Sequence, residues 1–153
     1  MVCDSLGFNK QRLSKGIAVF SGQSSMKKTL TAEIIAGELN IDLYKIDSSA
    51  IISKYIGETE KNLDRIFRDA ENNNMLLFFD EADALFGKRN KVKDSHDQYA
   101  KIESNFIFKK IEAHKGIVIF ATNVSKNIPN AFVSQINFIV EFPEKSVNEK
   151  GKV

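Results

Sequence analysis

Short runs of apolar residues alternate along this chain with segments of helical periodicity, and this alternation constrains the fold most. The strand-like runs are residues 16–22, 42–46, 75–79, 116–123 and 138–142. The helix-like segments are residues 28–39, 59–72 and 98–113, and a short helix is expected after Pro129. Strands and helices in this order indicate an α/β layer structure with a parallel sheet. Ligands of such sheets bind beyond the carboxyl ends of the strands.

The length and charge of the chain limit what it can be. Its 153 residues suit one domain, and 22 basic against 20 acidic residues give a net charge of +2. This balance argues against a dedicated nucleic-acid or membrane-surface binder. One cysteine, Cys3, excludes an internal disulfide, and no apolar run approaches the ~20 residues of a membrane span. We expect a cytoplasmic protein with a lead-in over residues 1–15, a core over 16–143 and a polar tail over 144–153.

A phosphate-binding frame follows the first strand. The pattern G-x-x-x-x-G-K-[ST] is matched at Gly22, Lys28 and Thr29, while Lys27 stands where the second glycine is expected. Such a loop directs backbone N–H groups and a lysine at phosphate, and its hydroxyl binds magnesium. The candidate cofactor-binding residues are Gly22, Gln23, Ser24, Ser25, Met26, Lys27, Lys28, Thr29 and Leu30. The same residues also fit a strand–turn–helix with two surface lysines.

Polar residues end two of the other strands. Asp80 and Glu81 follow a strongly apolar run, where an acidic pair is costly without a partner or a role. Asp80 can hold magnesium together with Thr29, and Glu81 can serve as general base for the water that attacks a γ-phosphate. Asn123, at the end of another strand, can orient that water. The acids alone would also fit the first turn of a helix.

These motifs, in this order, resemble the ATPase core of the AAA+ superfamily, in the AAA group that remodels proteins. Residues 22–29 align with the Walker A loop, 76–83 with Walker B, 121–123 with sensor 1, and 53–63 with the pore loop and the helix after it. The resemblance implies a three-layer P-loop NTPase-like sandwich with a five-stranded parallel sheet of order 5-1-4-3-2. It also implies ATP and Mg²⁺ at the carboxyl edge and a homo-oligomeric ring. Its pore loop, which grips a polypeptide client, would comprise Lys54, Tyr55, Ile56 and Gly57, although Tyr55 and Ile56 also fit ordinary core packing.

The sequence departs from the family where catalysis is expected. Ser25, Met26 and Lys27 replace the glycine-containing G-T-G part of the loop, and a positive φ costs a non-glycine residue on the order of 1 kcal/mol. Ser134 and Gln135 stand where arginine fingers are expected, and no arginine follows Arg89. The resemblance also implies a helical lid after the last strand; we expect none in these 153 residues, either because the chain is a fragment or because the lid was lost.

Two functions follow from these observations. The first is a nucleotide-binding core whose ATP hydrolysis drives protein remodelling, impaired in this chain and with weak or lost binding of ATP. The alternative is a non-catalytic, degenerate AAA domain that serves as a binding or scaffold module. In either case we expect a monomer for this chain alone.

Overall fold

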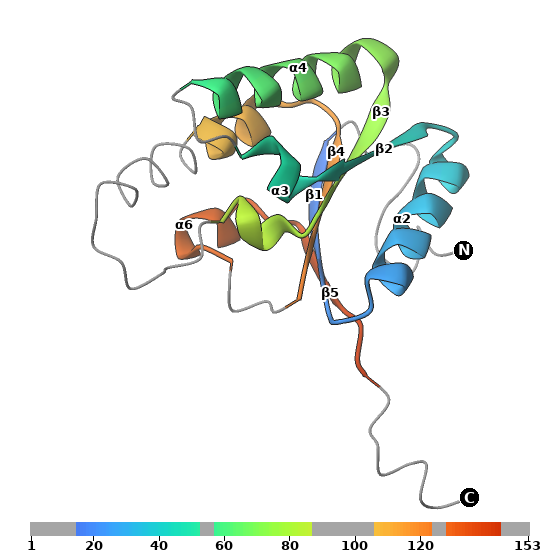
Figure 1. Ribbon diagram of the computed structural model, residues 1–153. Coiled ribbons are helices and arrows are strands. Elements are labelled where there is room, and N and C mark those ends of the chain that lie inside the picture. The colour runs from blue at the N-terminus through green and yellow to red at the C-terminus, as the bar shows by residue number, and fades with distance from the viewer. Residues whose placement is uncertain (1–14, 53–56, 87–105, 124–127, 145–153) are drawn as a thin grey trace, which may run out of the picture.

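The computed structural model describes residues 15–52, 57–86, 106–123 and 128–144 (Figure 1). Residues 106–113 are helical, which confirms the second half of the helix predicted over 98–113; its first half lies outside the described residues. The remaining elements are β1 (Gly16–Ser21), α2 (Ser25–Leu39), β2 (Asp42–Asp47), α3 (Ser48–Ile51), α4 (Glu58–Asn73), β3 (Met75–Asp80), a 3₁₀ turn (Ala82–Ala84), β4 (Ile117–Thr122), α6 (Asn130–Val133) and β5 (Phe138–Glu141).

The five strands form one sheet in the order β2-β3-β4-β1-β5, with every pair parallel. This is the predicted order 5-1-4-3-2, read from the opposite edge, and it confirms the α/β fold class. The register places Ser21 beside Thr122 and Asp47 beside Asp80. The carboxyl ends of the strands therefore meet at one edge of the sheet.

Helices cover both faces of the sheet, so the structure has three layers (Figure 1). On one face, the sheet packs against Ala32, Ile35 and Ala36 of α2. On the other face it packs against α3, α4, α6 and the helix over residues 106–113. Strands β1 and β4 are buried along their whole length because they lie inside the sheet, whereas β2 and β5 are edge strands with exposed residues. No helix in the described ranges is long and apolar enough to cross a bilayer.

Phenylalanine rings fill the larger of the two cores. The rings of Phe79 and Phe120 stack with their centroids 5.1 Å apart, and Phe132 meets Phe120 edge-on at 5.3 Å. All three side chains are fully buried. Since each buried ring stabilises a fold by roughly 1.5–3 kcal/mol, this cluster fixes β3, β4 and α6 relative to one another.

The ends of the helices follow from local backbone chemistry. Helix α4 begins after Gly57, which has φ 83° as its N-cap, and ends at Asn74, which has φ 51°. Helix α2 ends at Asn40, with φ 58°. Glycine and asparagine are the residues that adopt this left-handed region at least cost. The sequence did not predict the short helix α3, which is capped by the Asp47 side chain: Ser49 N–H donates to Asp47 Oδ1 at 3.0 Å.

One asparagine attaches the edge strand β5 to β1. Ile17 N–H donates to Asn137 Oδ1 at 2.9 Å, and Asn137 N–H donates to the Ile17 carbonyl at 2.8 Å. At the far end of the same strand pair, Phe142 N–H donates to the Ser21 carbonyl at 2.7 Å. These contacts bring Phe142 beside the loop that follows β1.

His114 is buried in the layer under α4. It is 3% exposed, its Nδ1 lies 3.3 Å from Glu71 Oε1, and its ring meets Phe67 edge-on. Burial lowers the pKa of His114, the Glu71 carboxylate opposes this effect, and Lys15 adds to it. The folded protein therefore takes up a proton at His114 less readily than the unfolded chain does.

We predict that the folded protein loses stability through His114 as the pH falls. Below about pH 6.5 the unfolded state binds the extra proton, so the free energy of unfolding decreases with acidification until His114 is protonated in the fold as well. The variant His114→Phe should show a shallower decrease between about pH 7.5 and 5 in urea unfolding. Glu71→Gln should make the decrease steeper, because the opposing charge is gone. Parallel curves for all three proteins would contradict this role of His114.

Candidate functional site

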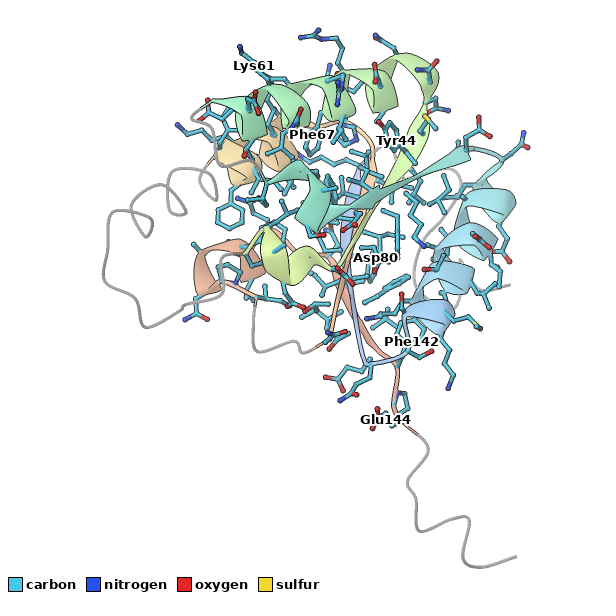
Figure 2. The ribbon with its side chains drawn as sticks, viewed as in Figure 1. Tyr44, Lys61, Phe67, Asp80, Phe142 and Glu144 are labelled. Carbon is cyan, nitrogen blue, oxygen red and sulfur yellow. The ribbon has the colours of Figure 1, made fainter. Side chains whose placement is uncertain are left out.

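The sequence-predicted site residues converge at the carboxyl edge of the sheet. Residues 22–29 follow β1, Asp80 ends β3, and Asn123 follows β4. Figure 2 shows Asp80 at this edge. The structure thus brings together three of the predicted motifs.

Gly22 is fixed by close packing against the end of β5. Its φ is 149°, and a Cβ atom there would lie 2.6 Å from the Phe142 carbonyl oxygen. Its N–H donates to the Thr122 carbonyl at 3.1 Å. A side chain at position 22 would force β5 away from β1, so this glycine of the motif has a structural reason independent of any ligand.

The rest of the predicted loop is wound into helix α2. Ser24 is the N-cap, and its Oγ accepts a hydrogen bond from Lys27 N–H at 3.3 Å. The helix begins at Ser25, not at Lys28 as predicted, so only Gly22 and Gln23 lie between the end of β1 and the capping serine. Helical Ser25, Met26 and Lys27 have no positive φ, and the backbone strain expected for these residues is therefore absent.

Lys28 is buried, contrary to the interpretation of the motif as two surface lysines. It is 2% exposed, and its Nζ donates to the Gly22 carbonyl at 2.6 Å and to the Thr122 carbonyl at 3.0 Å. Burial lowers the pKa of Lys28, while the carboxylates of Asp80, Asp83 and Glu81 act in the opposite direction. The ammonium group therefore joins the ends of β1 and β4 at the centre of the candidate site.

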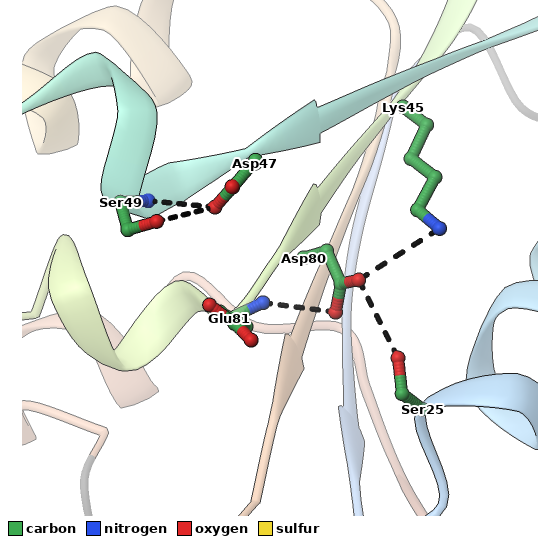
Figure 3. A network of polar contacts seen from close by, with 6 residues as sticks. All are labelled: Ser25, Lys45, Asp47, Ser49, Asp80 and Glu81. Atoms are coloured by element: carbon green, nitrogen blue, oxygen red, sulfur yellow. Dashed lines mark hydrogen bonds and ion pairs between the residues drawn. The ribbon is translucent and has the colours of Figure 1, made fainter.

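Thr29 and Asp80 supply the two oxygens predicted to bind a metal. Thr29 Oγ1 is buried, and within the described ranges it has no hydrogen-bond partner. Asp80 Oδ1 accepts from Glu81 N–H at 2.9 Å, while Oδ2 accepts from Ser25 Oγ at 3.5 Å (Figure 3). No group of three or more histidine, cysteine or acidic residues that could hold a metal occurs in the part of the chain that the structure describes.

Lys45 is a site residue that the sequence reasoning missed. Its Nζ lies 3.8 Å from Asp80 Oδ2, on the same oxygen that faces Ser25 (Figure 3). The side chain of Lys45 is half exposed, whereas Asp80 is largely buried. The sequence could have indicated Lys45, because side chains two residues apart in a strand share a face and Lys45 lies two residues before Asp47 in β2.

Asp83 is a second missed residue. It is buried, and its Oδ1 accepts a hydrogen bond from Thr122 Oγ1, while Oδ2 accepts one from Asn123 N–H at 3.4 Å. These bonds join the 3₁₀ turn after β3 to the end of β4. Glu81, in contrast, is exposed and adopts a left-handed backbone with φ 51°. Asn123 is also exposed, so its side chain is free of the protein core.

The two positions expected to lack arginine fingers, and the predicted pore loop, lie elsewhere. Ser134 follows α6, is exposed, and donates from Oγ to the Ala131 carbonyl at 3.5 Å. Gln135 N–H donates to the Phe132 carbonyl at 2.9 Å. Of the predicted pore loop, only Gly57 is described, as the N-cap of α4; Lys54, Tyr55 and Ile56 lie outside the described residues.

Comparison with known proteins agrees with this fold. Residues 18–144 match a family model described as "ATPase family associated with various cellular activities (AAA)". An uncharacterized AAA family ATPase, y4kL, from Sinorhizobium fredii is 32% identical over 124 residues, which is 81% of this chain and 38% of that protein. The ATPase family gene 2 protein of Schizosaccharomyces pombe is 32% identical over 76% of this chain and 15% of its own length. Cell division protein C of Sulfolobus acidocaldarius is 31% identical over 78% and 34%.

The parallel sheet, the site at its carboxyl edge and the match over most of its length show that this chain belongs to the AAA family of ATPases. The matched family is one of ATPases, and its model covers the part of the chain that carries this site. The chain spans less than two fifths of the length of the three relatives named above.

We predict that the stability of the fold depends on Asp83 more than on Glu81, the other acidic residue compared at this edge. Asp83→Ala removes the acceptor of Thr122 Oγ1 and Asn123 N–H, and should lower the free energy of unfolding by about 1–3 kcal/mol. The control Glu81→Gln changes an exposed side chain and should stay within about 0.5 kcal/mol of the parent. Urea unfolding at neutral pH measures both, and equal losses in the two variants would contradict the assignment.

Proposed function

We propose that this chain is a nucleotide-binding AAA core that binds ATP weakly and hydrolyses it poorly. The observation that carries this proposal is the winding of residues 25–27 into helix α2. In that form the backbone from Ser25 to Lys28 is helical, whereas a phosphate group would need an open cradle of N–H groups there. Nucleotide binding is inferred from the family, and the weakness of that binding is inferred from the altered loop.

The residues that would serve the nucleotide are those at the carboxyl edge. Lys28 would bind the outer phosphates, and the first turn of α2 (residues 25–27) would present N–H groups and a favourable dipole. Thr29 Oγ1 and Asp80 Oδ2 fit Mg²⁺, which takes few protein ligands and completes its shell with water and phosphate oxygens. When bound, Mg²⁺ would neutralise charge on the β- and γ-phosphates.

Glu81 and Asn123 would serve the attacking water. An exposed glutamate beside Asp80 can accept a proton from that water as general base, and the Asn123 amide can orient it. Ser134 and Gln135 carry no charge to place on a neighbour's γ-phosphate, a contribution worth ~10³–10⁵ in rate when an arginine makes it. Slow hydrolysis is therefore expected even where nucleotide binds.

Binding of phosphate has two costs in this fold. The Lys28 ammonium already donates two of its three N–H groups to the Gly22 and Thr122 carbonyls, at 2.6 and 3.0 Å, which leaves one for a phosphate. Lys45 also competes with a metal ion for Asp80 Oδ2. Both costs lower affinity for Mg-ATP without abolishing the anion-binding character of the site.

By resemblance, the wider function would be protein remodelling by a homo-oligomeric ring. In that proposal Lys54, Tyr55, Ile56 and Gly57 would form the loop that grips a polypeptide client. Because Ser134 and Gln135 stand where arginine fingers are expected, another subunit would have to supply the positive charge at the γ-phosphate of such a ring. The alternative, a degenerate domain that only binds or scaffolds, is favoured by the same wound loop if nucleotide binding is lost altogether.

We predict that glycine at positions 25 and 27 improves nucleotide binding. Each glycine costs a helix about 1 kcal/mol, so the double variant Ser25→Gly/Lys27→Gly should free the start of α2 and allow positive φ there. Calorimetry with Mg-ATP should then give an affinity at least about tenfold higher than that of the parent, whose dissociation constant should be weaker than micromolar.

The matched control is Lys61→Gly/Arg65→Gly, which places two glycines at exposed positions of α4 and should leave affinity unchanged. Micromolar or tighter binding by the parent would contradict the proposed impairment. Absence of binding by both the parent and the Ser25→Gly/Lys27→Gly variant at millimolar Mg-ATP would favour the scaffold alternative.

A further inference from the structure

Lys45 places an ammonium group on the carboxylate that the candidate site would offer to a metal ion. Its Nζ lies 3.8 Å from Asp80 Oδ2, the oxygen that also accepts from Ser25 Oγ at 3.5 Å (Figure 3). The other oxygen, Asp80 Oδ1, accepts from Glu81 N–H at 2.9 Å. Both oxygens of Asp80 therefore already contact donors or positive charge from this chain.

The register of the sheet sets the contact between Lys45 and Asp80. Strands β2 and β3 are parallel, and Lys45 is paired with Phe78, two residues before Asp80. Side chains two residues apart in a strand share a face, and Phe78 packs into the core that α2 covers. Leu43 packs into the same core, so Lys45, two residues further along β2, lies on that face as well. The ion pair thus follows from the pairing of two strands rather than from a loop.

Asp80 needs a cation more than Lys45 needs an anion. The side chain of Asp80 is 17% exposed and that of Lys45 is 50% exposed, so water solvates the ammonium group much better than the carboxylate. Mg²⁺ takes one or two protein carboxylates and fills its other positions with water and phosphate oxygens. A metal ion at Asp80 Oδ2 has to displace Lys45, because two cations on one oxygen repel each other.

The other carboxylates of this edge offer less to a metal ion. Asp83 is buried, and its two oxygens accept hydrogen bonds from the end of β4. Asp47 Oδ1 accepts from both the N–H and the hydroxyl of Ser49, at 3.0 and 2.7 Å (Figure 3). Glu81 is exposed, so water and salt screen its charge. The partner of Asp80 therefore decides how much a metal ion gains here.

We propose that Lys45 is a specificity-determining residue of this edge, and that it makes the site favour metal-free ATP over Mg-ATP. Lys45 supplies the positive charge at Asp80 that the metal ion would otherwise bring. Metal-free ATP also carries more negative charge than Mg-ATP, so the ammonium group of Lys28 and the amino end of α2 attract it more strongly. This preference rests on the proposed function, since it concerns the form in which the nucleotide binds.

Manganese tests the role of Lys45 without nucleotide. Bound Mn²⁺ broadens the NMR signals of nearby amides, and those of Ser25 and Glu81 report on Asp80. Lys45→Met should bind Mn²⁺ at this edge about two- to fivefold more tightly than the parent, which is the effect of losing one exposed ion pair. Lys45→Arg keeps the charge and should match the parent. Equal affinities of the parent and Lys45→Met, or no broadening in either protein, overturn the proposal.

Calorimetry with ATP in EDTA and in Mg²⁺ tests the preference itself. The parent should bind ATP about two- to fivefold more tightly in EDTA, whereas Lys45→Met should lose this preference. The matched control Lys109→Met removes an exposed lysine from the helix over residues 106–113, on the other face of the sheet, and should keep it.

Two results of the calorimetry overturn the proposal. One is a parent that binds ATP at least as tightly in Mg²⁺ as in EDTA, and the other is the same preference in the parent and in Lys45→Met. If neither protein binds ATP in either buffer at millimolar concentration, the proposed function fails and the preference fails with it. The Mn²⁺ titration then still supports or overturns the hold of Lys45 on Asp80, so the two failures are distinguishable.

Discussion

The buried ammonium group of Lys28 is the interaction on which the carboxyl edge of the sheet depends. A charge in the interior requires partners, and Lys28 finds them in the Gly22 carbonyl after β1 and the Thr122 carbonyl at the end of β4. Asp80, Asp83 and Glu81 provide the compensating negative charge. One side chain of α2 therefore holds the helix and two strand ends together. The same ammonium group is the one that we propose for a phosphate, and two of its three N–H groups already donate to these carbonyls.

The residues that stand in place of glycine at positions 25 and 27 determine where helix α2 begins. Without glycine, the backbone avoids positive φ by adopting helix, and the cap moves back to Ser24. Met26 lies on the outer face of α2, where its side chain is 73% exposed. In the proposed function, this helical start of α2 is the reason for weak binding of phosphate. Gly22 packs so closely against Phe142 that a side chain there would collide with its backbone.

The sequence predicted the architecture well and the site less well. Apolar runs at β1, β3 and β4 are unambiguous because these strands are buried on both faces, and the period of α4 is strong. The short helix α3 and the start of α2 were missed or misplaced, since four residues hold no periodicity and since the loop motif suggested an open turn. Lys45 and Asp83 were missed because their roles arise from neighbours distant in sequence, Asp80 for one and Thr122 for the other.

Carbon-13 chemical shifts of residues 25–27 in the free protein test most directly whether the glycine-poor loop is part of helix α2. Helical Cα shifts for Ser25, Met26 and Lys27, continuous with those of Thr29 and Leu30 and still helical on addition of Mg-ATP at micromolar concentration, are the predicted result. Shifts typical of an irregular loop, or a loss of the helical values when nucleotide is added at micromolar concentration, would contradict it.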